Sequence, residues 1–284
     1  MQNLNTLKDL SGWSKHLPDS VVMPVIFAGH GSPMNAIEDT SFAKTWRKMG
    51  QNLQPQPAAI LCISAHWLTQ GSTAITAMPE PATIHDFGGF PQSLFNVQYP
   101  AMGNRDLISN TIAAIHSRKI QPDLSWGLDH GTWSILVNMF PEANIPVVQL
   151  SIDYDLSAQQ HYDLAKELTI LRRKGVLIIA SGNTVHNLRM LARHHPHAEN
   201  FGYDWAIETD SRIKNYWLNH DHEALINWEK QGQAFRLAIP TPDHYYPMLY
   251  SLALQEDQDE MLLFNEGTTM GSLNMTSFIL QQAF

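Results

Sequence analysis

The sequence predicts an α/β fold, a single domain in which a mainly parallel or mixed central sheet is flanked by helices. Apolar runs rich in β-branched residues, typical of buried strands, occur at 24–28, 59–65 and 175–181. Segments with helical spacing separate these runs, and an alternation of strand and helix is typical of a mainly parallel sheet. Each run also ends at or shortly before a histidine, namely His30, His66 and His186.

Length and composition favour one domain that acts on small molecules. The chain has 284 residues and no linker-like stretch, so we expect one large domain over 23–284 after an N-terminal arm, 1–22. A net charge of −9 leaves no basic face for nucleic acid. Because no apolar run approaches the roughly 18 residues of a membrane helix, and no signal-peptide core is present, we predict a cytoplasmic chain without membrane or nucleic-acid partners. The single cysteine, Cys62, should be buried.

The first half of the chain alternates strands with helices. Residues 41–53 carry apolar side chains at three- and four-residue spacing and predict an amphipathic helix. Residues 72–78 are strand-like. The next segment, 79–100, contains four prolines and predicts a long loop, and loops of this length are usually functional or disordered. An apolar stripe predicts a helix over 104–120.

The second half continues the alternation and ends in strands. The predicted elements follow in this order: a helix opening at 128–133 and ending near Pro141, a strand over 145–152, a helix from Ser157 to Arg173, the strand before His186, helices over 187–195 and 204–230, a helix starting at 241–247, and closing strands within 261–284.

The positions of the histidines predict a metal site at the carboxyl ends of the strands. Ligands of open α/β sheets bind at that edge, so His30, His66 and His186 should converge there. Neutral imidazole is also the commonest side-chain metal ligand. His244, at a predicted helix start, and His130, in a turn, are weaker candidates. Their spacing in the sequence is equally consistent with a site residue and with an ordinary loop histidine.

Other readings of the sequence have less support. No GxGxxG, Walker, CxxC, HExxH or GxSxG motif is present, so dinucleotide, nucleotide triphosphate, structural zinc and serine hydrolase sites are not indicated. His194, His195 and His197 point in different directions at a predicted helix end and should lie on a solvated face. His161 is expected on a polar helix face.

Seven segments together resemble a known family: HGSPMN (30–35), SAHW (64–67), TIHDFGGFP (83–91), DHGTW (129–133), PVVQLSID (146–153), ASGNTVHNLR (180–189) and TPDHYYPMLY (241–250). In this order they are similar to the bacterial 4,5-DOPA extradiol dioxygenases, of the protocatechuate 4,5-dioxygenase catalytic-subunit superfamily. The similarity extends from about residue 23 to the closing GSLNMTS (271–277).

The resemblance implies a mononuclear non-haem site with one divalent metal ion. The residues that match the family's metal-site histidines are His30, His66, His186 and His244. Iron(II) would be the catalytic metal, although zinc is commonly assigned in this group, and O₂ would be the co-substrate. Because extradiol sites typically combine two histidines with a carboxylate, the all-histidine set leaves open whether His186 is a ligand or an acid–base residue.

The implied reaction opens a catechol ring beside its diol, in DOPA between carbons 4 and 5 to give seco-DOPA. A base must take a catechol proton and an acid must return it, and histidine suits both tasks. His186 and His130 are the candidates, with His85 as a possible substrate contact. A zinc hydrolase with a metal-bound hydroxide and a non-catalytic metal-binding protein remain alternatives, as do a monomer and a small homo-oligomer.

Overall fold

The computed structural model describes residues 16–192 and 201–282. Most of the predicted arm, residues 1–15, lies outside the described residues, as do His194, His195 and His197. Within the described part of the chain, no helix is long and apolar enough to cross a membrane.

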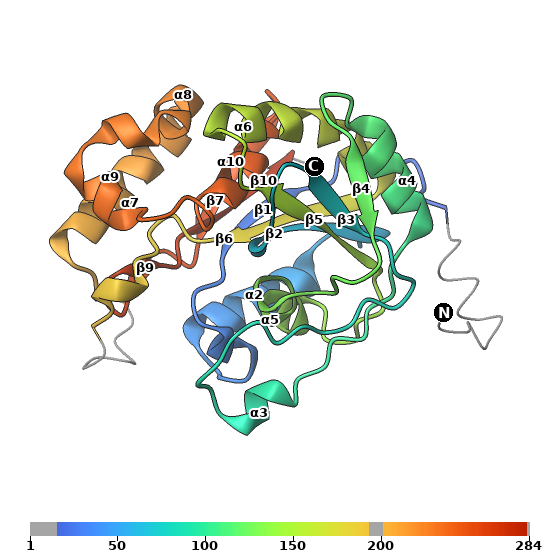
Figure 1. The fold of residues 1–284 in the computed structure, drawn as a ribbon, viewed down its shortest axis with the longest axis horizontal. Helices are drawn as coiled ribbons and strands as arrows, with labels where there is room; N and C mark the ends of the chain where they lie inside the picture. The colour runs from blue at the N-terminus through green and yellow to red at the C-terminus, as the bar shows by residue number, and fades with distance from the viewer. Residues whose placement is uncertain (1–15, 193–200, 283–284) are drawn as a thin grey trace.

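A mixed eight-stranded sheet forms the centre of the fold (Figure 1). Its strands lie in the order β4 (Ile120–Asp123), β3 (Thr73–Thr76), β5 (Val147–Asp153), β2 (Ala59–Thr69), β6 (Val176–Gly182), β1 (Val25–Gly29), β10 (Ser277–Gln282) and β7 (Asp259–Phe264). Strands β5, β2, β6 and β1 are parallel, whereas β3 and β10 pair antiparallel with β5 and β1. A separate ribbon joins β8 (Thr268–Thr269) to β9 (Leu273–Asn274). The predicted fold class is therefore confirmed, and the three strands that lead to His30, His66 and His186 are adjacent and parallel.

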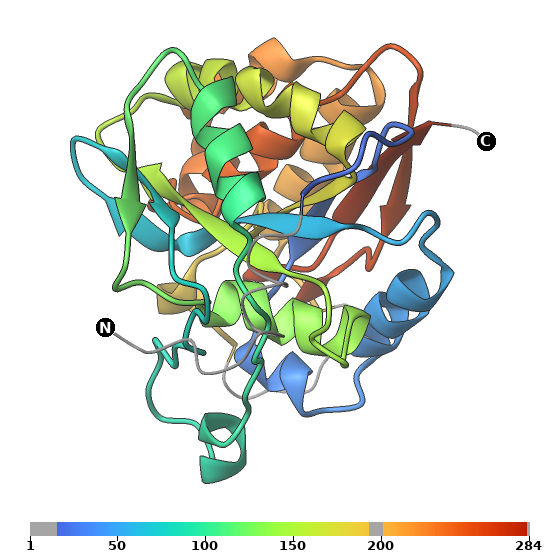
Figure 2. The same ribbon diagram turned by 90° about the vertical axis from the view of Figure 1, so that its right-hand side faces the viewer.

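Helices cover both faces of the sheet, because successive strand side chains point to opposite faces. In β1, Val25 and Phe27 belong to one core cluster, and Ile26 and Ala28 to the other. The second cluster contains residues of α2 (Ser41–Asn52), α3 (Gln92–Phe95) and α5 (His130–Met139). The first contains residues of α4 (Arg105–Ala114), α6 (Ala158–Lys166), α7 (Asp204–Leu218), α8 (His222–Ile226), α9 (Gln233–Ala238) and α10 (Tyr246–Ala253). The two helical layers lie on opposite sides of the sheet (Figures 1 and 2).

Two predicted helices after β6 differ from the structure. Where one helix was expected over 204–230, α7 stops at Leu218, and α8 and a 3₁₀ turn (Trp228–Gln231) follow. The break occurs because His220 has φ 55°, a left-handed conformation that ends a helix, and Asp221 then caps α8. The helix expected over 187–195 is only a 3₁₀ turn, Leu188–Met190, in the described residues; residues 193–195 lie outside them.

Two earlier helices are shorter than predicted. The helix expected to reach Arg173 changes to a 3₁₀ helix, Glu167–Lys174, which ends at Gly175 with φ 67°. The helix expected over 104–120 ends at Ala114. The residues after Ala114 lead into β4, which begins at Ile120. That strand was not predicted because its sequence, Ile-Gln-Pro-Asp, has little β-propensity. The burial of Cys62 is confirmed.

The prediction that His161 lies on a polar helix face is wrong, because this residue lies in the core. Its side chain is fully buried, and Nδ1 lies 3.0 Å from the Tyr250 hydroxyl. Burial lowers the pKa of His161 to about 3, so this histidine is neutral at pH 7 and joins α6 to α10.

A buried ion pair fixes the edge of the sheet. The side chains of Arg172 and Asp259 are both 0% exposed, and their two N···O distances are 2.6 and 2.7 Å. Arg172 also donates to the carbonyl oxygens of Met23 and Leu254, each at 2.7 Å. One guanidinium thus connects the start of β1, the end of α10 and β7.

Arg172→Met is expected to lower the free energy of unfolding by about 3 to 5 kcal/mol, because the Asp259 carboxylate would remain buried without its partner. The matched control is Arg173→Met, which removes an ion pair with Glu256 whose partners are 44% and 21% exposed. Such pairs contribute about 0 to 1 kcal/mol. Urea unfolding of both variants measures the difference, and equal losses would show that burial of the pair is unimportant.

Candidate metal centre

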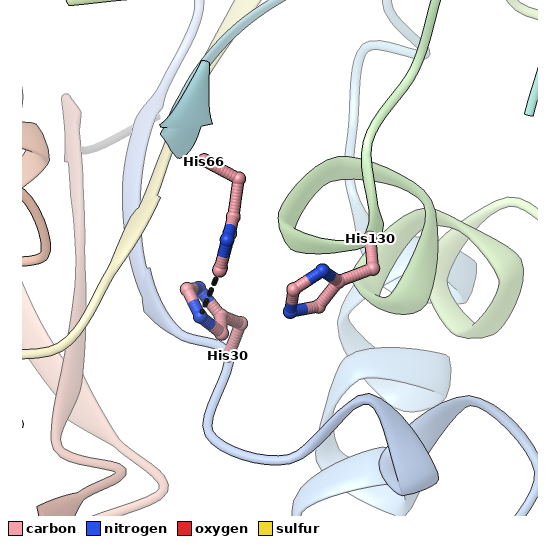
Figure 3. A group of neighbouring side chains, drawn as sticks. All are labelled: His30, His66 and His130. Atoms are coloured by element: carbon pink, nitrogen blue, oxygen red, sulfur yellow. Dashed lines mark hydrogen bonds between the residues drawn. The ribbon is translucent and has the colours of Figure 1, made fainter. Parts of the chain in front are cut away.

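Five histidines converge at the carboxyl ends of the central strands. His30 directly follows β1, His66 lies near the end of β2, and His186 comes four residues after β6. His130 is the first residue of α5, and His244 lies in the turn before α10. Figure 3 shows His30, His66 and His130 pointing toward one another from two strand ends and a helix start.

Local irregularities bring His66 and His130 into position. The pairing of β2 with β5 shifts register between Ile63 and Leu68, and bulges of this kind re-aim side chains next to active sites. Helix α5 then packs closely on β2 because residue 131 is glycine. A Cβ on Gly131 would lie 2.4 Å from Ser64 Oγ and 2.9 Å from His66 Cδ2. The ring centroids of His66 and His130 are therefore only 3.8 Å apart.

The hydrogen bonds of His30 fix which of its nitrogens is free. Ser181 donates its hydroxyl proton to the Gly131 carbonyl at 2.5 Å, so its oxygen is left to accept from His30 Nδ1 at 3.0 Å. The proton of His30 is therefore on Nδ1. The lone pair of Nε2 faces the other histidines, in the arrangement typical of metal-binding imidazoles.

Asp86 holds two histidines with its two oxygens. Oδ1 lies 2.9 Å from His130 Nδ1, and Oδ2 lies 3.3 Å from His66 Nδ1. Oδ1 also accepts from the backbone N–H of residue 130 at 2.9 Å. Although burial acts to raise the pKa of Asp86, the hydrogen bonds from His130 outweigh it and hold the pKa below its ordinary value. The resulting carboxylate favours the tautomers of His66 and His130 that carry the proton on Nδ1, and it leaves both Nε2 lone pairs available to the site.

His244 is also held through Nδ1 by a carboxylate, that of its sequence neighbour Asp243. Its Nδ1 is hydrogen-bonded to the Asp243 carboxylate, while its Nε2 is buried and has no hydrogen-bond partner among the described residues. Burial acts to raise the pKa of Asp243, but its contact with His244 holds the pKa well below the usual range. A buried nitrogen without a partner needs an explanation in a native structure, and a metal ion provides one.

Two neighbouring groups of donor atoms could hold a divalent metal ion among the described residues: His30, His66 and His130 form one and His186, Asp243 and His244 the other, each with ligand atoms within 4.8 Å of one another. The rings of His30, His66 and His244 form a triangle with centroid separations of 5.0, 4.9 and 5.3 Å. The Nε2 atoms of His30 and His66 lie 3.1 Å apart, where two lone pairs repel unless a cation or proton lies between them. Burial, and next the neighbouring imidazoles, hold the pKa values of His30 and His66 well below the usual range. Both rings are thus neutral, which is the form that binds metal.

His186 differs from the other four histidines in its contacts. Its ring is stacked on that of His244, with centroids 3.5 Å apart and planes 6° apart. Burial, and then the charge of His244, lower its pKa to about 2. Among the described residues, no carboxylate or carbonyl holds its Nδ1. The structure therefore places His186 at the site without the outer partner that the other four possess.

The histidines line a cavity of about 330 Å³. Its other walls are mostly apolar and come from four parts of the chain: Pro33, Phe87, Phe90, Leu188, Leu191, Met270 and Leu273. Asp86 is the carboxylate that reaches it. A cavity that combines a convergent polar group with apolar walls is typical of a small-molecule site, and here the walls suit a flat aromatic ring.

His85 does not line this cavity. Its Nε2 lies 3.1 Å from the Val97 carbonyl, and its ring packs against those of Phe87, Phe95 and Trp133. A direct substrate contact for His85 remains a prediction. The next residue, Asp86, occupies the position that the sequence analysis assigned to His85.

The fold and the site together define a class of protein, an α/β enzyme whose histidine-rich cavity at the strand ends can hold a divalent metal ion. Residues 23–271 match the family described as the catalytic LigB subunit of aromatic ring-opening dioxygenase, and the chain belongs to this family. It is therefore a ring-cleaving dioxygenase, and enzymes of this family use a divalent metal. The resemblance inferred from the sequence motifs is confirmed.

Individual relatives agree over nearly the whole chain. The chain is 42% identical over 263 residues to a 4,5-DOPA dioxygenase extradiol of Escherichia coli K12, covering 91% of this chain and 94% of the relative. A 4,5-DOPA dioxygenase extradiol of Beta vulgaris is 32% identical, with 90% and 96% covered. The crystal structure of an uncharacterized Escherichia coli K12 protein superposes with a TM-score of 0.78 at 36% identity, covering 91% of this chain and 100% of that one.

Proposed function

We propose that this enzyme opens DOPA between carbons 4 and 5, giving seco-DOPA. The observation that carries the proposal is the triangle of His30, His66 and His244, each with Nδ1 held by an outer partner and Nε2 directed inward. The names of the relatives support the catechol, and the apolar cavity beside the histidines suits its ring.

We assign one iron(II) ion per chain to His30, His66 and His244 through their Nε2 atoms. When bound, iron supplies a redox-active Lewis acid with open positions for a diol and for O₂. Three neutral imidazoles suit such an ion. The outer partners Ser181, Asp86 and Asp243 orient the rings and raise their basicity.

His130 is our proposed base for the catechol proton. Its Nε2 is free at the cavity, and its Nδ1 donates to Asp86, which would stabilise the imidazolium formed on proton uptake. His186, which was predicted to be a ligand, an acid–base residue or both, is assigned here to proton transfer. Unlike the three ligands it has no outer partner in the described residues. The apolar side chains of Phe87 and Phe90 exclude water around these protons.

Oxygen uptake tests this proposal directly. The enzyme is loaded with iron(II) without air, given DOPA and then exposed to O₂, and we expect one O₂ consumed per DOPA with a yellow ring-opened product. The same protein loaded with zinc, which has no redox chemistry, should consume none. If the iron-loaded enzyme consumes no O₂ with any catechol, a hydrolase or a non-catalytic metal-binding protein becomes the better description.

A further inference from the structure

A second cavity adjoins the metal cavity and has a different chemistry. Its volume is about 290 Å³, and four residues line both cavities: Ser32, Phe90, Met270 and Leu273. The segment that follows His30 and the chain around β8 and β9 form its remaining walls. We name this second cavity the side chamber. Its polar lining consists of Ser32, Asn35, Glu38, Thr40 and Thr269.

We propose that the side chamber binds the amine-bearing side chain of a catechol substrate, with the Glu38 carboxylate as the partner of the ammonium group. This inference rests on the proposed function, which places the diol at the histidines. A substituent on the far edge of the ring then points away from the metal cavity, and the chamber that shares four wall residues with it can receive that substituent.

The carboxylate of Glu38 is free to bind a cation. Within residues 16–192 and 201–282 it makes no hydrogen bond or ion pair. The adjacent carboxylate, Asp39, is instead engaged by Lys44 at 3.1 Å and by Arg47. The local positive charges are thus committed to Asp39, and Glu38 is left as an uncompensated charge on the chamber wall.

The backbone around Glu38 is held in a fixed relation to the metal site. Asn35 donates from Nδ2 to the His30 carbonyl at 3.1 Å and accepts on Oδ1 from the Thr40 hydroxyl at 3.0 Å. The N–H of Glu38 donates to the Met34 carbonyl at 2.9 Å. Hydrogen bonds therefore connect His30 to residues on both sides of Glu38, so the backbone that carries this exposed side chain is held at a set position relative to the histidines. Such an arrangement selects among substrates by charge and length.

The other polar groups of the side chamber are less suited than Glu38 to bind an ammonium group. Asn35 and Thr40 already bond to each other, and Asn35 also to His30. The hydroxyl of Ser32 accepts from the Met34 N–H at 3.3 Å. Glu38 is thus the residue in this lining that combines a full charge with an unused bonding capacity.

The test compares catechols of equal size and different charge. Dopamine carries an ammonium where 4-propylcatechol carries a methyl group, and DOPA carries one that 3-(3,4-dihydroxyphenyl)propionate lacks. In Glu38→Gln, which keeps the shape and removes the charge, the ratio of the dopamine KM to the 4-propylcatechol KM should rise about two- to fivefold, the range for one exposed charge pair. The ratio for DOPA over the propionate should rise likewise.

Glu223→Gln is the matched control, since it removes an exposed carboxylate in α8 that does not line the chamber and leaves Lys44 and Arg47 paired with Asp39. It should leave both ratios at the wild-type value. Calorimetric binding of dopamine and 4-propylcatechol to the zinc-loaded enzyme gives the same ratio without turnover. The binding result therefore stands even if the iron-loaded enzyme fails to cleave a catechol. Unchanged ratios in Glu38→Gln, or equal changes in Glu223→Gln, would overturn the assignment.

Discussion

His66→Ala is expected to purify without its metal ion and without ring-cleaving activity. The substitution removes one of the three inward-facing Nε2 atoms and leaves one Asp86 oxygen without its imidazole. Loss of an outer-shell partner alone costs about 10- to 100-fold in metal affinity or activity, so loss of a ligand should exceed this. His30→Ala should behave in the same way, because its Nε2 lies 3.1 Å from that of His66.

Metal content per chain and oxygen uptake, measured on the same iron-loaded sample, check this expectation. His85→Ala is a useful comparison for metal content, because this histidine lies on the loop beside Asp86 but does not line the metal cavity. It should retain about one ion per chain. Full occupancy in both His30→Ala and His66→Ala would remove the basis of the metal assignment.

His130→Gln is expected to keep a full complement of metal and to lose at least about a hundredfold in turnover, the lower end of the range for a general acid or base. Glutamine can still donate to Asp86 but cannot accept a proton from a catechol. The experiment is decisive because His130 lies in one cluster with His30 and His66, all with nitrogens within 4.8 Å of one another. Geometry alone would also allow it to be a ligand.

Metal analysis separates these roles. A metal-free His130→Gln protein would show that the residue is a ligand or supports the fold, and the triangle of His30, His66 and His244 would need revision. Normal turnover with full metal would mean that His130 is an ordinary helix-start residue. Only the combination of retained metal and slow turnover supports a proton-transfer role.

Local sequence patterns were enough to predict the central sheet and most of the histidine site. The apolar runs before His30, His66 and His186 form β1, β2 and β6, and the parallel arrangement of those strands confirms the expected convergence. This worked because strand burial is visible in short windows of sequence. The rule that ligands bind at strand ends then supplied the location.

The outer partners of His30, His66 and His130 were not predicted, because they depend on contacts between distant segments. Asp86 meets His130 across 44 residues, and Ser181 meets His30 across 151. The motif around residue 85 predicts a contact at His85, whereas the aspartate beside it is the residue that contacts His130 and His66. A signal was present, since histidine ligands regularly need a carboxylate or carbonyl behind them, and a search for spare acidic residues near the motifs would have found Asp86 and Asp243.

The helix errors have a different origin. The end of α7 depends on one non-glycine residue, His220, in a left-handed conformation, which side-chain periodicity does not reveal. The register shift in β2 is similar, since its sequence reads as a continuous strand. Both features are local backbone choices that tertiary packing imposes, and they are invisible to patterns of hydrophobicity.

Asp86 contacts both His130 and His66, so the basicity of His130 and the electron density of the His66 ring cannot be adjusted separately. When His130 gains a proton, the Oδ1 atom of Asp86 faces a cation, and the carboxylate has less negative charge to offer His66 through Oδ2. In the proposed mechanism, electron density at His66 Nε2 would then fall as the catechol loses its proton. If His130 is the base and His66 a ligand, as proposed, Asp86 couples the protonation state of one to the other. A substitution at Asp86, natural or engineered, therefore changes the surroundings of both His130 and His66. It has to be compensated by another change in the site.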